Sequence, residues 1–252
     1  MARNQKRTST NGKWFIPLFL GGLVVLLGVL IFLNRYTESQ DKQAQADLLK
    51  DMPNWTQIRG DIDTSKGIEY DKQPSLGSPD AKVKVVEVAD FKCPACMKWS
   101  TGDMKLFKEK YIDTGKVQFF FMNYPFIDRD SILAASAGEA LFHQSNEAFW
   151  QFADKLYEQQ GDEETIWATR DFLSDFVKKN VTGIDYDKFA EDFKNDTYML
   201  DVKLDYKVGG SLGVNGTPQF FINGVHQAAP QKGETRTTYE RLTEAVEAEL
   251  AK

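Results

Sequence analysis

The sequence predicts an α/β fold with an inserted helical subdomain, preceded by one N-terminal transmembrane helix. Residues 14–33 contain no charged side chain, and a helix needs roughly 20 apolar residues to cross a bilayer. Residues 83–122 have the pattern of strand, helix and strand, which is the order of a βαβ unit. Residues 131–196 keep a helical spacing of apolar side chains, which is too long for a simple crossover and indicates an inserted subdomain.

The N-terminal region predicts a retained membrane anchor. Residues 1–13 hold four Lys or Arg and no acidic residue, so this tail should be cytoplasmic and the rest of the chain extracytoplasmic. The apolar stretch exceeds the about 7–15 residues of a signal peptide, and no small-residue cleavage site follows it directly. Cleavage stays an alternative, because Ala44-Gln45-Ala46 has a suitable shape. Residues 34–66 predict a polar juxtamembrane linker, and residues 67–252 the folded domain.

Charge limits the partners of the exported part. The first 35 residues hold five of the 31 basic residues and none of the 37 acidic ones, so the remainder carries a formal charge of −11. Nucleic-acid binding needs a basic surface. This part of the chain is therefore not expected to bind nucleic acid.

The two cysteines of the chain stand in one motif, Cys93-Pro94-Ala95-Cys96. Such a pair supplies half of a zinc site or forms a reversible disulfide. Only His143 and His226 remain as further soft ligands, which makes zinc the poorer interpretation. A dithiol also suits an extracytoplasmic location, where disulfides persist.

The position of this motif separates the roles of its sulfurs. Residues 83–89 predict a buried strand, and helical spacing begins after it, with Pro94 in the first turn. Cys93 would then face unpaired backbone N–H groups and the positive end of the helix dipole, which favour a thiolate. We expect Cys93 to be the attacking sulfur, and Cys96, one turn further in, to be the buried resolving one.

The C-terminal part predicts a helix at 198–208, a hairpin and a final helix. Gly216-Thr217-Pro218 precedes two short apolar runs within residues 219–228. Asn223-Gly224 between these runs is the strongest short-range hairpin signal. Residues 237–251 have the apolar spacing of an amphipathic helix.

Together these features resemble the thioredoxin superfamily, and within it the DsbA-like thiol–disulfide oxidoreductases with a helical insertion. The anchor and spacing are most similar to membrane-anchored Gram-positive members of the BdbD type. The resemblance implies a thioredoxin fold whose Pro218 is cis and lies against the active-site sulfurs; the residues alone leave a trans proline equally open. It also implies that Thr217 offers its backbone to a substrate peptide. Pro94 and Ala95 would tune the redox couple and border the substrate.

The resemblance implies two further groups of residues. Glu87 matches a buried acid beneath the active site, where a raised pKa lets it relay the proton of the resolving thiol; a solvent-facing Glu87 is the alternative. Gln73, Glu139 and Asp205 match a structural calcium site in some Gram-positive relatives, with the oxygen ligands that a hard cation prefers. Three unrelated polar surface residues are the alternative there. The dithiol itself requires no cofactor.

The first functional hypothesis is an extracytoplasmic oxidase that introduces disulfides into exported cysteine-containing proteins. A DsbB-like membrane quinone reductase would reoxidise it. The second is a membrane-anchored reductase of the type used in cytochrome c maturation; a reduction potential above that of the glutathione pool would favour the oxidase. The third is a non-catalytic thioredoxin-like binding module.

Overall fold

The computed structural model describes residues 15–50, 52–227 and 236–252. The predicted basic tail and Trp14 lie outside the described residues, as does Ala228 in the predicted hairpin. The chain divides into two compact units, residues 1–47 and 48–252. Each unit is described by itself.

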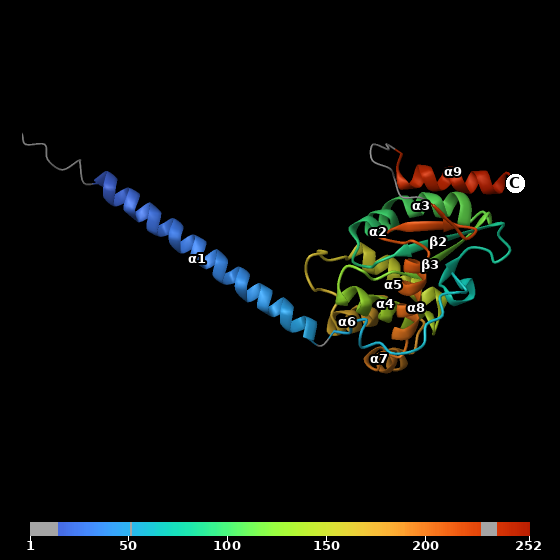
Figure 1. Ribbon diagram of the computed structural model, residues 1–252, viewed down its shortest axis with the longest axis horizontal. Helices are drawn as coiled ribbons and strands as arrows, with labels where there is room; N and C mark the ends of the chain where they lie inside the picture. Colours follow the sequence, from blue (N-terminus) through green and yellow to red (C-terminus); the bar gives the residue numbers. More distant parts are fainter. Residues whose placement is uncertain (1–14, 51, 228–235) are drawn as a thin grey trace, which may run out of the picture. The chain divides into compact units, whose positions relative to one another are not determined.

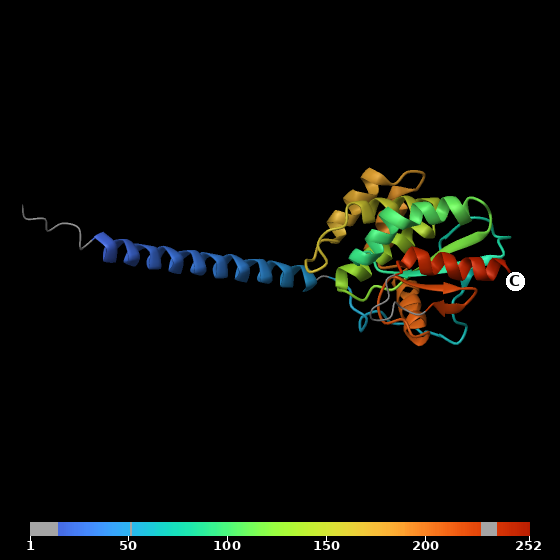
Figure 2. The same cartoon turned by 90° about the horizontal axis from the view of Figure 1, so that it is seen from above.

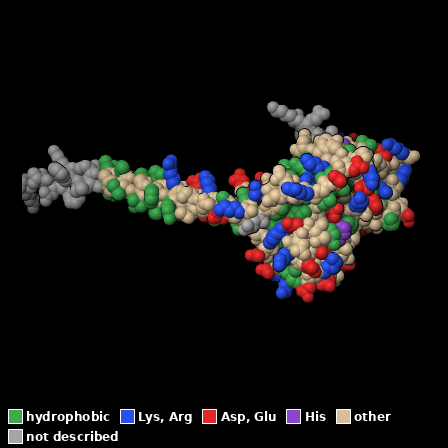
Figure 3. Space-filling view, turned by 60° about the horizontal axis from the view of Figure 1, so that its bottom comes forward, with side chains coloured by type: hydrophobic (Ala, Val, Ile, Leu, Met, Phe, Trp, Pro, Cys, Tyr) green, Lys and Arg blue, Asp and Glu red, His purple; other side chains and the backbone are tan. Residues whose placement is uncertain are grey.

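The predicted anchor lies in a long helix, α1 (Phe15–Lys50). From Phe19 on, this helix is long and apolar enough to cross a membrane, and none of its most apolar stretch is buried inside the structure. Hydrophobic side chains cover its first half, and charged ones appear only towards its C-terminal end (Figure 3). The predicted juxtamembrane segment is therefore helical as far as Lys50. The second compact unit already begins at Leu48, and Met52 and Ile58 are buried in it.

The second unit is built on a five-stranded sheet in the order β1-β3-β2-β4-β5. The strands are β1 (Ser75–Leu76), β2 (Val83–Ala89), β3 (Val117–Asn123), β4 (Gln219–Ile222) and β5 (Val225–Gln227). The two long strands, β2 and β3, are parallel and the other pairs antiparallel. The sequence did not predict β1, whose two residues pair with the edge of β3 within a turn-rich segment.

Side chains alternate along β2, so that helices cover both faces of the sheet. Val83 and Val85 pack in one cluster with the helical segment 94–112 and with α9 (Thr238–Leu250). Val86 and Val88 pack on the opposite face with α8 (Met199–Ser211). Figure 1 shows α2, α3 and α9 on one side of β2 and β3, and α8 on the other. This is the predicted thioredoxin fold.

The segment after the cysteine motif is one continuous helical stretch with two wider turns. It comprises α2 (Pro94–Lys98), a π-helical turn (Trp99–Asp103), α3 (Met104–Phe107) and a second π-helical turn (Lys108–Ile112). Each π turn lets the helix follow the sheet without a break. Apolar spacing predicted a helix here, but it did not predict the two π turns.

The predicted insertion is made of four helices, α4 (Arg129–Phe142), α5 (Asn146–Glu158), α6 (Arg170–Asn180) and α7 (Tyr186–Lys194). Each begins after a polar residue whose side chain accepts a hydrogen bond from a backbone N–H group at the start of the helix. These residues are Asp128, Ser145, Thr169 and Asp185. Such bonds pair backbone N–H groups that have no partner within the helix. The core of the insertion is continuous with Phe91, Cys93, Cys96 and Phe121. Figure 2 shows these helices grouped on one side and the β4–β5 hairpin on the other.

Candidate active site

The cysteine motif lies where β2 gives way to α2. Cys93 is the residue just before the first helical turn, in an extended conformation, and Pro94 opens the helix. The Cys93 side chain is 6% exposed and Cys96 is fully buried. The attacking sulfur thus lies at the surface end of the pair and the resolving sulfur inside it.

The loop that carries Cys93 is held by its own Asp90 and by Gln160 of the insertion. Asp90, almost fully buried, accepts hydrogen bonds from the backbone N–H groups of Lys92, Phe126 and Ile127. Gln160 donates to the carbonyl oxygens of Phe91 (2.8 Å) and Cys93 (3.1 Å). These bonds fix the backbone on both sides of the attacking sulfur.

A fully buried ion pair lies next to the same loop. The Lys92 ammonium donates to Asp130 Oδ1 at 2.7 Å and to the Thr165 carbonyl at 2.8 Å. The other Asp130 oxygen accepts from the backbone N–H groups of Trp167 and Ala168. Sequence reasoning missed Lys92, Asp130 and Gln160, because their partners are 37 or more positions away and no local motif marks them.

The two thiols have opposite pKa perturbations. The pKa of Cys93 is lowered to about 6, first by a hydrogen bond from the Cys96 thiol. Burial opposes this shift. The Thr217 side chain and the backbone N–H groups of Cys96 and Ala95 stabilise the Cys93 thiolate further. Burial, followed by the bond to Cys93, raises the pKa of Cys96 well above its ordinary value. At neutral pH the reduced pair therefore holds one thiolate, at Cys93.

Glu87 lies in the sheet beneath the sulfurs. It points to the same face as Val83 and Val85, between Phe121 on β3 and Phe220 on β4, and is 3% exposed. Burial raises the pKa of Glu87 to about 8; the indole N–H of Trp99 opposes this, and the charge of Cys93 adds to it. Its charge in turn raises the pKa of Cys96. The solvent-facing alternative does not match this position, and Trp99 is a neighbour that sequence reasoning missed.

The cis-proline loop lies against the attacking sulfur. The Thr217–Pro218 bond is cis, and the Cys93 thiol donates to the Thr217 carbonyl oxygen at 3.3 Å. Thr217 and Pro218 are half-buried, whereas Pro94 and Ala95 are exposed. These four residues form a rim around Cys93.

The residues predicted to hold calcium do lie together, away from the sulfurs. Gln73 donates to Asp205 Oδ1 at 2.7 Å, and Asn123 bridges the two carboxylates, donating to Asp205 Oδ2 from its backbone and to Glu139 Oε1 from its side chain. All four residues are buried, and burial raises the pKa of both carboxyl groups, to about 7 for Asp205. Asn123 is a member of this group that the sequence did not indicate.

A buried dithiol at a helix start, in contact with a cis-proline loop on a thioredoxin fold, defines a class: the thiol–disulfide oxidoreductases. A family model described as thioredoxin matches residues 69–248. The probable disulfide bond formation protein D of Bacillus anthracis is 40% identical over 183 residues, 73% of this chain and 81% of that protein. Disulfide bond formation protein D of Bacillus subtilis is 32% identical over 178 residues, 71% of this chain and 77% of that protein.

Solved structures agree with these relatives. The oxidised BdbD of Bacillus subtilis has a TM-score of 0.66 at 30% identity, covering 74% of this chain and 97% of that one. DsbA of Chlamydia trachomatis has a TM-score of 0.62 at 18% identity, covering 76% of this chain and 96% of that one, and shares the fold. The chain belongs to the thioredoxin family, among its DsbA-like members, and is a protein disulfide oxidoreductase.

Proposed function

We propose that this protein is a membrane-anchored, extracytoplasmic oxidase that introduces disulfides into exported cysteine-containing proteins through Cys93 and Cys96. The observation that carries the proposal is the lowered pKa of Cys93, about 6, next to a resolving thiol whose pKa is raised. A stabilised thiolate stabilises the reduced protein and so makes its disulfide a stronger oxidant; DsbA illustrates the same link. The names of the Bacillus relatives support the same direction of electron flow.

The reaction runs as two thiol–disulfide exchanges. A substrate thiolate attacks Cys93 Sγ of the oxidised protein, the Cys93–Cys96 bond breaks, and Cys96 leaves as a thiolate that takes a proton from Glu87. A second substrate thiolate then attacks the substrate sulfur of the mixed disulfide, and Cys93 leaves. Two substrate thiols become one disulfide, and the protein disulfide becomes a dithiol. The low pKa of Cys93 makes it the better leaving group in the second step.

The surroundings of the dithiol supply binding and proton transfer. The rim of Pro94, Ala95, Thr217 and Pro218 borders the substrate, and the Thr217 backbone pairs with an extended peptide. Buried Glu87 holds a proton near neutral pH, within electrostatic reach of Cys96. It can therefore protonate a leaving thiolate that water does not reach.

Location and recycling complete the proposal. Helix α1 anchors the protein with its N-terminus in the cytoplasm, and the unit from Leu48 on lies outside. A DsbB-like membrane quinone reductase takes the two electrons from the reduced dithiol. The acidic exported part, formally −11, does not favour nucleic acid as a partner.

A trapping experiment tests the function. Cys96→Ala in cells should leave Cys93 disulfide-linked to exported proteins that contain cysteines. By reversal of the second exchange, the Cys93 thiolate attacks a substrate disulfide and a substrate thiolate leaves; no Cys96 thiol is then present to attack Cys93 Sγ and release the substrate. The double variant Cys93→Ala/Cys96→Ala is the matched control and should trap nothing. Capture of only a cytochrome precursor or a thiol carrier would contradict the oxidase and identify the reductase. Unchanged disulfide formation in cells that carry only Cys93→Ala would instead indicate a non-catalytic binding module.

We also propose that Gln73, Glu139 and Asp205, with Asn123, hold a structural calcium ion. Two buried atoms of this group, Gln73 Oε1 and Asn123 Oδ1, have no hydrogen-bond partner among the described residues. Two buried carboxyl groups lie beside them, so the set offers the oxygen ligands that calcium uses. Calcium should raise the thermal midpoint of the protein, and Asp205→Asn should remove this effect, whereas exposed Asp80→Asn should not. The same calcium effect in Asp205→Asn would contradict the proposal.

A further inference from the structure

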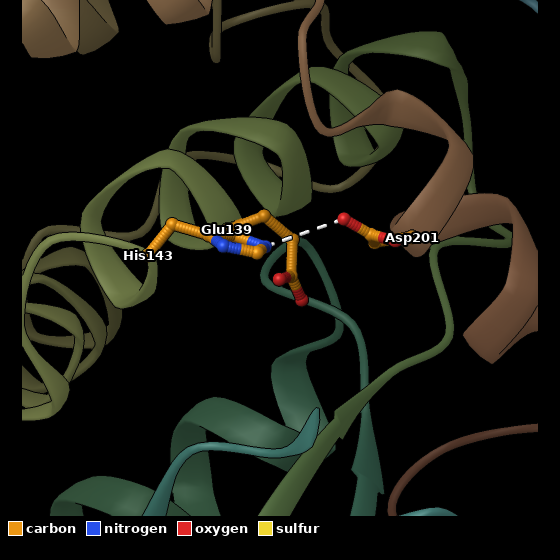
Figure 4. A group of neighbouring side chains, drawn as sticks. All are labelled: Glu139, His143 and Asp201. Carbon is orange, nitrogen blue, oxygen red and sulfur yellow. Dashed lines mark hydrogen bonds and ion pairs between the residues drawn. The ribbon is translucent and has the colours of Figure 1, made fainter. Parts of the chain in front are cut away.

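Three metal-binding side chains meet between α4 and α8, at the outer end of the pocket that contains the calcium residues. Glu139 lies in the last turn of α4, His143 is the residue directly after that helix, and Asp201 lies in the first turn of α8. Figure 4 shows His143 and Asp201 pointing toward each other from the two sides, with the Glu139 carboxylate beside them and turned away from the line that joins them. One ligand atom from each lies within 4.8 Å of the other two, and His143 Nε2 is 3.3 Å from Asp201 Oδ2.

This spacing suits one small cation. A tetrahedral ion with bonds of about 2.0–2.2 Å needs ligand atoms roughly 3.3–3.6 Å apart. The His143–Asp201 pair already meets that separation, and Glu139, within 4.8 Å of both, has to approach by at most about 1.5 Å. The side chains of His143 and Asp201 are 41% and 49% exposed, so water can supply a fourth ligand.

The His143 ring is held in position by a stacked neighbour. Its centroid lies 3.9 Å from that of Tyr198, at an interplanar angle of 10°. This contact fixes the ring plane while Nε2 faces Asp201. A ligand whose orientation is set before the ion arrives loses little conformational freedom on binding.

The pocket that these residues line also holds a buried oxygen without a partner, the Gln73 oxygen already assigned to the calcium group. The pocket has a volume of about 450 Å³ and is lined by Glu139, His143, Asp201 and Gln73, among others. Gln73 is only 7% exposed, and its Oε1 has no hydrogen-bond partner among the described residues. Buried polar atoms in proteins are nearly always paired, so this oxygen calls for a donor or an ion.

We propose that Glu139, His143 and Asp201 form a binding site for a zinc-class divalent cation. The donor set of one imidazole and two carboxylates selects zinc-class ions, whereas calcium takes oxygen ligands only. Only Glu139 belongs to both this set and the calcium group. The two sites therefore compete for one carboxylate, and variants outside the shared residue separate them.

Cobalt(II) is the probe for the test, because it replaces zinc and has visible absorption. The full-length, untagged chain is used in non-ionic detergent with its dithiol oxidised, so that Cys93 and Cys96 cannot bind the metal. We expect one Co²⁺ per chain in a titration that follows absorbance. His143→Ala should weaken binding at least about tenfold, since loss even of an outer-shell partner costs ~10–100-fold.

His226 provides the matched control, because it is the other histidine of the chain and stacks on Phe221, apart from this pocket. His226→Ala should bind Co²⁺ as the wild type does, and Asp201→Asn should resemble His143→Ala. Equal Co²⁺ affinity in the wild type and His143→Ala, or no stoichiometric binding by the wild type, would overturn the proposal.

A second comparison separates this site from the calcium site. Asp205→Asn should lose the calcium effect and keep Co²⁺ binding, whereas His143→Ala should do the reverse. Loss of Co²⁺ binding in Asp205→Asn to the same extent as in His143→Ala would show that the ion uses the inner oxygen ligands, and would also overturn the separate site.

Discussion

Replacing Glu87 by glutamine should stabilise the folded, reduced protein at neutral pH. The pKa of this carboxyl group is raised from 4.5 to about 8 by burial, so the folded state holds a proton that the unfolded state releases above pH 4.5. The contribution of this carboxyl group to the free energy of unfolding therefore falls as the pH rises from about 4.5 to 8. Glutamine has nearly the same shape and no proton to lose.

The size of the effect follows from the same values. At pH 7 the group is still mostly protonated when folded and ionised when unfolded, a difference of about 2.5 pH units. Each unit corresponds to ~1.36 kcal/mol, so the ionisable glutamate lowers the free energy of unfolding by about 3 kcal/mol at pH 7, compared with glutamine at the same position. At about pH 4 both states are largely protonated and the cost is close to zero.

Urea unfolding, followed by tryptophan fluorescence on the full chain in non-ionic detergent, measures this difference. Glu87→Gln should be more stable than wild type by about 3 kcal/mol at pH 7 and about equally stable at pH 4. Glu109→Gln, at an exposed carboxylate of the helical segment, should change stability by less than about 0.5 kcal/mol at either pH. A Glu87→Gln variant no more stable than wild type at pH 7, or equally stabilised at both pH values, would refute the reasoning.

Three further predictions concern the active-site loop and the packing of α8 on the sheet. Cys96→Ala should raise the Cys93 pKa by about 1–2, because a hydrogen bond to a charged group contributes ~1.5–3 kcal/mol; thiolate absorbance at 240 nm measures this, and an unchanged pKa would contradict the assigned bond. Lys92→Met should lower the unfolding free energy by about 3–5 kcal/mol, because it leaves a buried carboxylate unpaired; a loss below 1 kcal/mol in urea unfolding would count against it. Gly209→Ala places a Cβ 2.8 Å from the ring of a buried tyrosine and should destabilise by ~1–3 kcal/mol. Gly102→Ala meets nothing within 4 Å and should be neutral or stabilising by up to about 1 kcal/mol in the same assay.

Local sequence determined the features that depend on periodicity and spacing. The uncharged run from residue 14 to 33 predicted the helix found in α1, because length and hydropathy alone decide whether a segment suits a membrane. The β-branched run before Cys93 and Pro94 after it predicted a strand-to-helix junction, which the structure has. These signals lie within about ten residues of the atoms that they position.

Only the tertiary structure decided which distant groups share the site. Thr217 and Cys93 are 124 positions apart and lie in contact because β4 pairs with β2. Lys92 meets Asp130, and Asn123 joins Asp205 to Glu139, only because the insertion and α8 pack beside the sheet. Periodicity fixes which face a residue takes, whereas sheet register and packing fix its partner. The pKa values that set the chemistry arise from those partners and from the burial that they create.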